Sequence, residues 1–149
     1  MAAYFLDSSA LSKRYLEEKG TARVLEITGG SDRLVVSRLA MVEVASAAAR
    51  RAREGTVSPE LRDEILRALE DDFRSTFEVV ELSTAAVTRS VDLTRVHALR
   101  AADAIQLACA LIAHGDRASA GQFALVSSDG ELNAAAQQEG VTVIDPAAD

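Results

Sequence analysis

The chain has 149 residues, of which 48% are hydrophobic and 26% charged, a balance that excludes a disordered or collagen-like protein. The 16 Lys and Arg residues against 23 Asp and Glu give a net charge of −7, which argues against a broad basic surface for duplex DNA. The single cysteine, Cys109, excludes an internal disulfide and a multi-cysteine zinc site.

The N-terminal half is predicted to contain two strands and four helices. Ser37 is placed to cap a long helix that ends at Arg53, and Ser58-Pro59 is typical of a helix start. We expect strands at residues 4–6 and 33–36, and helices at residues 8–18, 21–27, 37–53 and from residue 59 onward. The predicted inward-facing side chains of the two long helices are Leu39, Val42, Ala45, Ser46 and Ala49, and Leu61, Ile65, Leu66 and Leu69.

The C-terminal half continues the alternation of strands and helices. Strands are predicted at residues 77–82, 123–126 and 141–144, and helices after Ser83, at residues 101–115 and at residues 131–138. Val87, Val91 and Leu99 are expected to face inward. About five short apolar strands separated by about seven helices favour a mainly parallel sheet covered on both faces. Residues 1–149 therefore form one predicted α/β domain with three layers.

No segment has the features of a membrane span or a signal peptide. The longest strongly apolar stretch, Ala104 to Ala113, is shorter than the roughly 20 residues that a span requires. The N-terminus has no basic region before Asp7. We expect a cytoplasmic protein that does not contact a membrane.

Four acidic residues occupy positions where a ligand site is expected. Asp7 follows the first strand, Asp129 follows the strand at residues 123–126, and Asp103 lies in the first turn of a helix. Glu43 lies about two turns into the helix that follows the second strand. Because ligand sites in parallel sheets lie outside the carboxyl ends of the strands, all four acids are predicted to point to one end of the molecule.

Each acid also has a structural interpretation. Asp7 and Asp129 can cap helices, and Asp103 suits the positive end of a helix dipole. Glu43, in an otherwise apolar stretch, is the hardest to explain in this way. Converging carboxylates raise one another's pKa values, and a divalent cation removes that conflict. Oxygen ligands without His or Cys favour Mg²⁺ or Mn²⁺ over zinc.

A carboxylate cluster with Mg²⁺ or Mn²⁺ is typical of phosphoryl chemistry, in which the metal activates water for attack on phosphorus. An aspartate-nucleophile phosphatase would require a second acid where Ser9 stands and a lysine late in the chain, and neither is present. Gly29-Gly30 lacks the Lys-Ser/Thr of a Walker A loop, and no GxGxxG motif follows the first strand. A non-catalytic partner-binding domain remains the alternative from a different class.

Four segments of the chain resemble the PIN-domain ribonucleases, and most closely the VapC-type toxins of toxin–antitoxin pairs. They are Tyr4-Phe5-Leu6-Asp7-Ser8-Ser9-Ala10-Leu11, Ser37-Arg38-Leu39-Ala40-Met41-Val42-Glu43-Val44, Leu99-Arg100-Ala101-Ala102-Asp103-Ala104-Ile105-Gln106, and Leu125-Val126-Ser127-Ser128-Asp129. The resemblance covers nearly the whole chain. A histidine often stands in that family where this chain has Gln106.

The resemblance implies a PIN-like α/β/α fold and catalytic roles for Asp7, Glu43, Asp103 and Asp129. Asp7 and Asp103 would bind Mg²⁺ (or Mn²⁺) directly, Glu43 would complete the cluster, and Asp129 would hold a coordinated water or a second ion. Ser8 would support the first acid.

The resemblance also implies what the protein binds and acts on. The substrate would be RNA, either a tRNA or a ribosomal RNA loop, cut by a Mg²⁺-dependent endoribonuclease. A small cognate antitoxin would inhibit the toxin, with an arginine pairing with the acids, and the chain would form a homodimer. From the sequence itself, Lys13, Arg14, Arg38 and Arg50 are candidates for a basic rim that holds RNA; solvated helix charges are the equal alternative.

Overall fold

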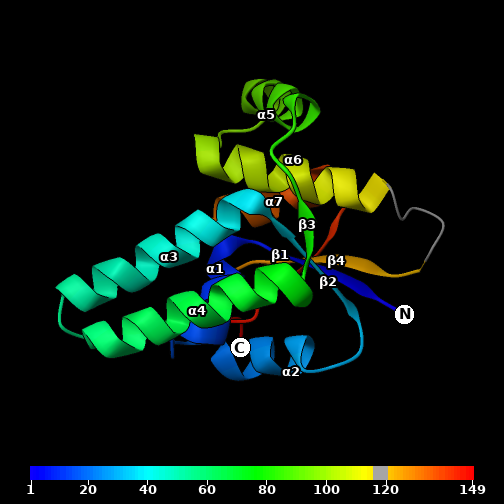
Figure 1. Cartoon of the computed structure of the whole chain (residues 1–149). Helices are drawn as coiled ribbons and strands as arrows, with labels where there is room; N and C mark the ends of the chain where they lie inside the picture. The colour runs from blue at the N-terminus through cyan, green and yellow to red at the C-terminus, as the bar shows by residue number, and fades with distance from the viewer. Residues whose placement is uncertain (116–120) are drawn as a thin grey trace.

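The computed structural model describes residues 1–115 and 121–149 and contains one sheet in which all neighbouring strands are parallel, in the order β3-β2-β1-β4-β5 (Figure 1). The strands are β1 (Ala3–Leu6), β2 (Arg33–Ser37), β3 (Glu78–Val80), β4 (Phe123–Val126) and β5 (Thr142–Ile144). The helices of these residues are α1 (Ser8–Tyr15), α2 (Thr21–Thr28), α3 (Arg38–Arg53), α4 (Pro59–Ser75), α5 (Thr84–Val96), α6 (Ala101–Gly115) and α7 (Gly130–Gln138). The predicted three-layer α/β/α fold with five parallel strands is confirmed.

Helices cover both faces of the sheet because successive strand residues point to opposite sides. Phe5 and Leu125 belong to a core shared with α5, α6 and α7. Leu6 and Val126, the next residues along the same strands, belong to a core shared with α1, α2, α3 and α4. Helices α1 to α4 therefore cover one face of the sheet, and helices α5 to α7 cover the other.

Short polar caps begin three of the helices at the predicted positions. The side chains of Ser37, Ser58 and Ser83 accept hydrogen bonds from the backbone amides three residues ahead, at 3.0–3.1 Å. Pro59 occupies the first turn of α4, where its missing amide hydrogen costs nothing. These local signals explain why the element boundaries match the expectation closely here.

The helices α3 and α4 lie side by side and project from the sheet as a pair (Figure 1). Their far ends enclose a small apolar cluster of Leu16, Ala48, Val57 and Ile65. Leu16 adopts an extended conformation at the end of α1, so that helix stops at Tyr15 rather than at the expected residue 18. Burial of Leu16 against α3 and α4 is favourable enough to end the helix early.

The predicted inner face of α5 is wrong. Val87 and Val91 are 48% and 50% exposed, whereas Ala86, Ser90 and Leu93 are buried. The small Ala86 and Ser90 allow α5 to pack closely on the alanine-rich α6. Within the described residues, no single helix is long and apolar enough to cross a membrane; α5 and α6 reach that length only together, across a bend of 116°.

The buried faces of α3 and α4 also differ in part from the prediction. On α3 the buried residues are Ala40, Val44 and Ala48, four residues apart, while Val42 is 65% exposed. On α4 Leu61 is exposed, but the remaining predicted positions are buried or partly buried. In α3 the spacing of apolar residues fits more than one face, and contact with α4 selects the one that is buried.

The orientation of α5 is tested by two alanine substitutions on the same helix. We expect Leu93→Ala to lower the free energy of unfolding by about 2–4 kcal/mol, because it empties a buried site. Val91→Ala should change the unfolding free energy by less than about 0.5 kcal/mol, because that side chain is half exposed. Urea denaturation measures both. Equal losses for the two variants would contradict this orientation.

Candidate active site

The candidate site lies where the strand order reverses. The chain runs from β1 to its neighbour β2, and later enters β4 on the opposite side of β1. A crevice opens at the carboxyl ends of the strands at such a point. Asp7 follows β1 there, and the segment from Ser127 to Asp129 follows β4. The backbone amide of Asp7 donates to the carbonyl of Val126 at 3.2 Å, which holds these two strand ends together.

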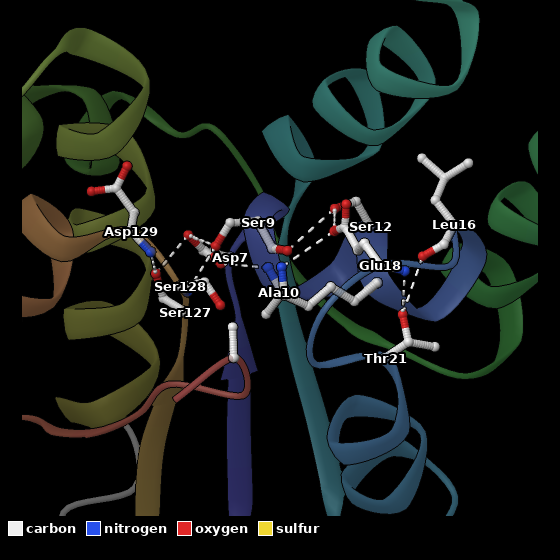
Figure 2. Close-up of polar contacts among 12 residues, drawn as sticks. Asp7, Ser9, Ala10, Ser12, Leu16, Glu18, Thr21, Ser127, Ser128 and Asp129 are labelled. Carbon is white, nitrogen blue, oxygen red and sulfur yellow. Dashed lines mark hydrogen bonds and ion pairs between the residues drawn. The ribbon is translucent and has the colours of Figure 1, made fainter. Parts of the chain in front are cut away.

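Asp7 is 2% exposed and its carboxylate is almost fully hydrogen-bonded (Figure 2). It caps α1 by accepting from the amide of Ala10 at 2.9 Å. The Ser9 hydroxyl lies 2.7 and 2.9 Å from its two oxygens, and the Ser127 hydroxyl donates to Oδ2 at 2.9 Å. Donors from α1 and from the end of β4 therefore fix the direction of this carboxylate.

Burial raises the pKa of Asp7 to about 6, even though the hydrogen bonds from Ser9, Ala10 and Ser127 lower it. The negative charge of Asp129 raises the pKa further. Neutral donors thus compensate only part of the cost of burying this charge. The site contains an acid whose ionisation is opposed by its surroundings.

Two serines connect the first and fourth strand ends. Ser127 accepts from the amide of Asp129 at 3.1 Å, and the Ser9 hydroxyl accepts from the amide of Ser128 at 3.0 Å. Asp129 in turn caps α7. The supporting role that the family resemblance implied for Ser8 falls to Ser9 and Ser127, because Ser9, one residue further into the first turn of α1, reaches the capping carboxylate.

Asp103 lies in the first turn of α6 and is electrostatically coupled to the other acids. Partial burial raises its pKa, as does the charge of Asp129; Arg100, at 3.9 Å, lowers it in part. Glu43 and Glu131 raise the pKa of Asp103 as well. The charge of Asp129 also raises the pKa of Asp7, so Asp129 acts on both of these acids.

Glu43 is held by a buried amide from the opposite layer. The Gln106 side-chain nitrogen donates to Glu43 Oε1 at 2.7 Å, and Gln106 Oε1 accepts from the Ser37 hydroxyl at 2.9 Å. Gln106 is 1% exposed. The orientation of Glu43 on α3 therefore depends on α6 and on the end of β2.

The donor chemistry of this edge fits a hard divalent cation. Asp7, Glu43, Asp103 and Asp129 offer carboxylate oxygens only. The pKa values of Asp7 and Asp103 are raised chiefly by burial and further by neighbouring negative charge. Among the described residues, no three acidic, imidazole or thiol groups are placed to ligate one ion. Mg²⁺ keeps several waters and needs only one or two protein carboxylates, so it does not require a complete cage.

Three of the four residues proposed for a basic rim are neutralised by carboxylates. Lys13 pairs with Glu18 at 3.2 Å, Arg14 pairs with Asp72 at 3.1 Å, and Arg38 pairs with Glu81 at 2.6 Å. Lys13 is also buried. The fourth, Arg50, lies on the wall of a groove beside Glu43. These ion pairs favour the alternative of ordinary helix charges for the first three residues, and the basic rim stays a prediction.

Sequence reasoning missed the residues that hold the acids in place. The sequence shows that Ser9 and Ser127 stand near the ends of two strands, but it does not show that their hydroxyls point toward Asp7. Gln106 stood out only as a departure from the family pattern. Glu131, in the first turn of α7, contributes negative charge near Asp103 and was not considered.

Comparison with known proteins identifies the family. The model of the PIN domain matches residues 4–138. Ribonuclease VapC45 and Ribonuclease VapC49, from two strains of Mycobacterium tuberculosis, are each 36% identical to the chain over 111 residues, which are 74% of this chain and 76% of theirs. A toxin–antitoxin complex from Klebsiella pneumoniae is 20% identical, with a TM-score of 0.65 over 96% of this chain and 97% of the matched chain, which shows the shared fold. The chain belongs to the PIN-domain family and is of the VapC type.

Proposed function

We propose that this protein is a Mg²⁺- or Mn²⁺-dependent endoribonuclease that acts as the toxin of a toxin–antitoxin pair. The observation that carries the proposal is the buried Asp7 carboxylate at the end of β1, held by Ala10 and Ser127. The negative charge of Asp129 acts on both Asp7 and Asp103, and that of Glu43 acts on Asp103. The names of the two Mycobacterium tuberculosis relatives support RNA as the substrate.

In this proposal Asp7 and Asp103 hold the cation, and Glu43 and Asp129 complete the acidic cluster. A divalent cation supplies charge neutralisation for the phosphodiester and lowers the pKa of water. Ser9 and Ser127 keep the Asp7 carboxylate directed by donating to it. Gln106 occupies Oε1 of Glu43, which leaves Oε2 to take a proton from the attacking water.

The substrate and partners follow the same proposal. Aromatic residues make up only 4% of the chain, so a short cleavage site in a tRNA or ribosomal RNA loop fits better than a long channel that stacks bases. The toxin–antitoxin complex from Klebsiella pneumoniae supports a small antitoxin as partner. We further propose a single PIN domain over residues 1–149, a homodimer, and action in the cytoplasm, where such RNA is found.

A non-catalytic partner-binding domain is the second candidate, and one observation favours it. Asp7 and Asp129 both cap helices, so both have a structural role that needs no catalysis. Asparagine caps a helix about as well as aspartate but has no negative charge. Replacing aspartate by asparagine therefore separates the two functions.

We expect Asp7→Asn and Asp103→Asn each to abolish RNA cleavage and growth arrest in a host, because each removes a charge that binds the cation. For Asp7→Asn the free energy of unfolding should stay within about 1 kcal/mol of the parent or rise, since asparagine keeps the cap of α1. Asp92→Asn, an exposed acid on α5, is the matched control and should cleave normally. Cleavage by either site variant at the parent rate would contradict the assignment of these acids, whereas failure of the parent protein itself to cleave RNA would favour the binding domain.

The raised pKa of Asp7 predicts a pH-dependent stability. Its folded pKa of about 6 lies above its ordinary value of 3.8, so its contribution to stability is full below about pH 4 and is lost as pH rises through 6. Without divalent cations, the unfolding free energy of the parent relative to Asp7→Asn should fall by up to about 3 kcal/mol between about pH 4 and about pH 7.

Added Mg²⁺ or Mn²⁺ should restore part of this loss at neutral pH, because the cation binds the ionised carboxylate of the folded state. Urea denaturation in chelator and in excess MgCl₂ measures the effect, and Asp7→Asn should show little of it. If neither Mg²⁺ nor Mn²⁺ changed the free energy of unfolding of the parent protein, this result would contradict the proposed metal site.

A further inference from the structure

A polar groove runs between α1 and α3, beside the candidate active site. Its volume is about 460 Å³, and its polar lining comprises Ser8, Ser9 and Ser12 from α1 and Glu43, Ser46 and Arg50 from α3. We call it the α1–α3 groove. It touches the acidic cluster at two points, since Glu43 is part of that cluster and Ser9 donates to Asp7.

The α3 wall of the groove is one stripe of the helix. Glu43, Ser46 and Arg50 are three and then four residues apart, so their side chains share a face. Seven residues of helix rise roughly 10 Å, which separates Arg50 from Glu43 along the axis. The groove therefore leads away from the acids toward a positive charge.

Three of the donors in this groove are free to bind a ligand. The side chains of Arg50, Ser8 and Ser46 have no hydrogen-bond or ion-pair partner in residues 1–115 and 121–149. By contrast, Lys13, Arg14 and Arg38 are already paired with carboxylates. Glu43 is the one acid of the lining, and its Oε1 accepts a hydrogen bond from Gln106. It lies at the opposite end of the stripe from Arg50.

We propose that the α1–α3 groove binds a backbone phosphate of the RNA strand next to the phosphodiester that is cut. Arg50 is the main contact, because a guanidinium matches phosphate oxygens with two parallel hydrogen bonds. The hydroxyls of Ser8 and Ser46 add neutral donors. In a protein with a net charge of −7, such a local positive point is needed to dock a polyanion close to four acids. This inference rests on the proposed ribonuclease function.

The test measures binding of a fluorescein-labelled, mixed-sequence RNA oligonucleotide by fluorescence anisotropy in a buffer that contains Mg²⁺. Every protein in the test carries Asp103→Asn, which is expected to prevent cleavage of the probe. We expect Arg50→Ala to weaken binding about tenfold and Arg50→Lys to restore part of it. For Arg50→Ala, the magnitude of the slope of log affinity against log salt concentration should be smaller by roughly one than for the protein that keeps Arg50. The control, Arg53→Ala, removes an exposed arginine of the same helix outside the groove and should change affinity less than about twofold.

A second probe with the same sequence and uncharged methylphosphonate linkages isolates the phosphate contact. Arg50→Ala should have no effect on its binding. Equal RNA affinity of the Arg50→Ala and Arg53→Ala variants would overturn the groove assignment and leave the ribonuclease proposal standing. The groove assignment would also be overturned if Arg50→Ala weakened binding of the uncharged probe as well. The same holds if Arg50→Ala weakened binding of a cognate antitoxin but not of RNA. Failure of the unsubstituted protein to bind or cut any RNA would instead overturn the proposed function itself.

Discussion

The buried carboxylate of Asp7 is the interaction on which the site depends. It caps α1 and accepts a hydrogen bond from the Ser127 hydroxyl at the end of β4. It also accepts from the Ser9 hydroxyl, which in turn accepts from the backbone amide of Ser128. The fold therefore uses this side chain to join β1, α1 and β4. Its pKa of about 6 shows that neutral donors do not fully offset its burial beside Asp129. A cation would supply the compensation that the protein itself omits.

The structural and chemical roles of the acids are compatible because they involve different properties of the same group. A cap requires an acceptor oxygen, which a carboxylate provides whether or not a cation is near. Metal binding requires the charge. Asp129 shows the same combination, since it caps α7 and also raises the pKa values of Asp7 and Asp103. An acid that caps a helix can therefore also bind a cation through its charge.

Sequence signals predicted the features that depend on neighbouring residues. Apolar runs identified the strands, serines identified three caps, and the placement of Asp7 and Asp129 followed from the strand ends. Packing between distant elements was not predictable in this way. The buried face of α5 is set by close contact with α6, which turns Val87 outward.

Ion pairs illustrate the same limit for the site. Arg14 pairs with Asp72, which is 58 residues away in the chain, and Arg38 pairs with Glu81, which is 43 residues away. Nothing local in the sequence marks these arginines as neutralised. The hydrogen bond from Gln106 to Glu43 spans 63 residues and depends on how α3 and α6 pack. Residue types at strand ends can be predicted, but their partners require the fold.

The acidic character of the chain constrains how it can engage RNA. Repulsion from the net charge of −7 and attraction by one exposed arginine are both screened beyond about 8 Å in physiological salt. Productive docking must therefore bring the strand close before attraction acts, and that favours a short contact over a long basic track. In the proposed mode, Glu43 and Arg50 at opposite ends of one helical stripe would provide such a contact. A bound cation would make the acidic end attractive to phosphate, and the arginine would attract it at the other end. The spacing along α3 would then set the direction in which the strand crosses the site.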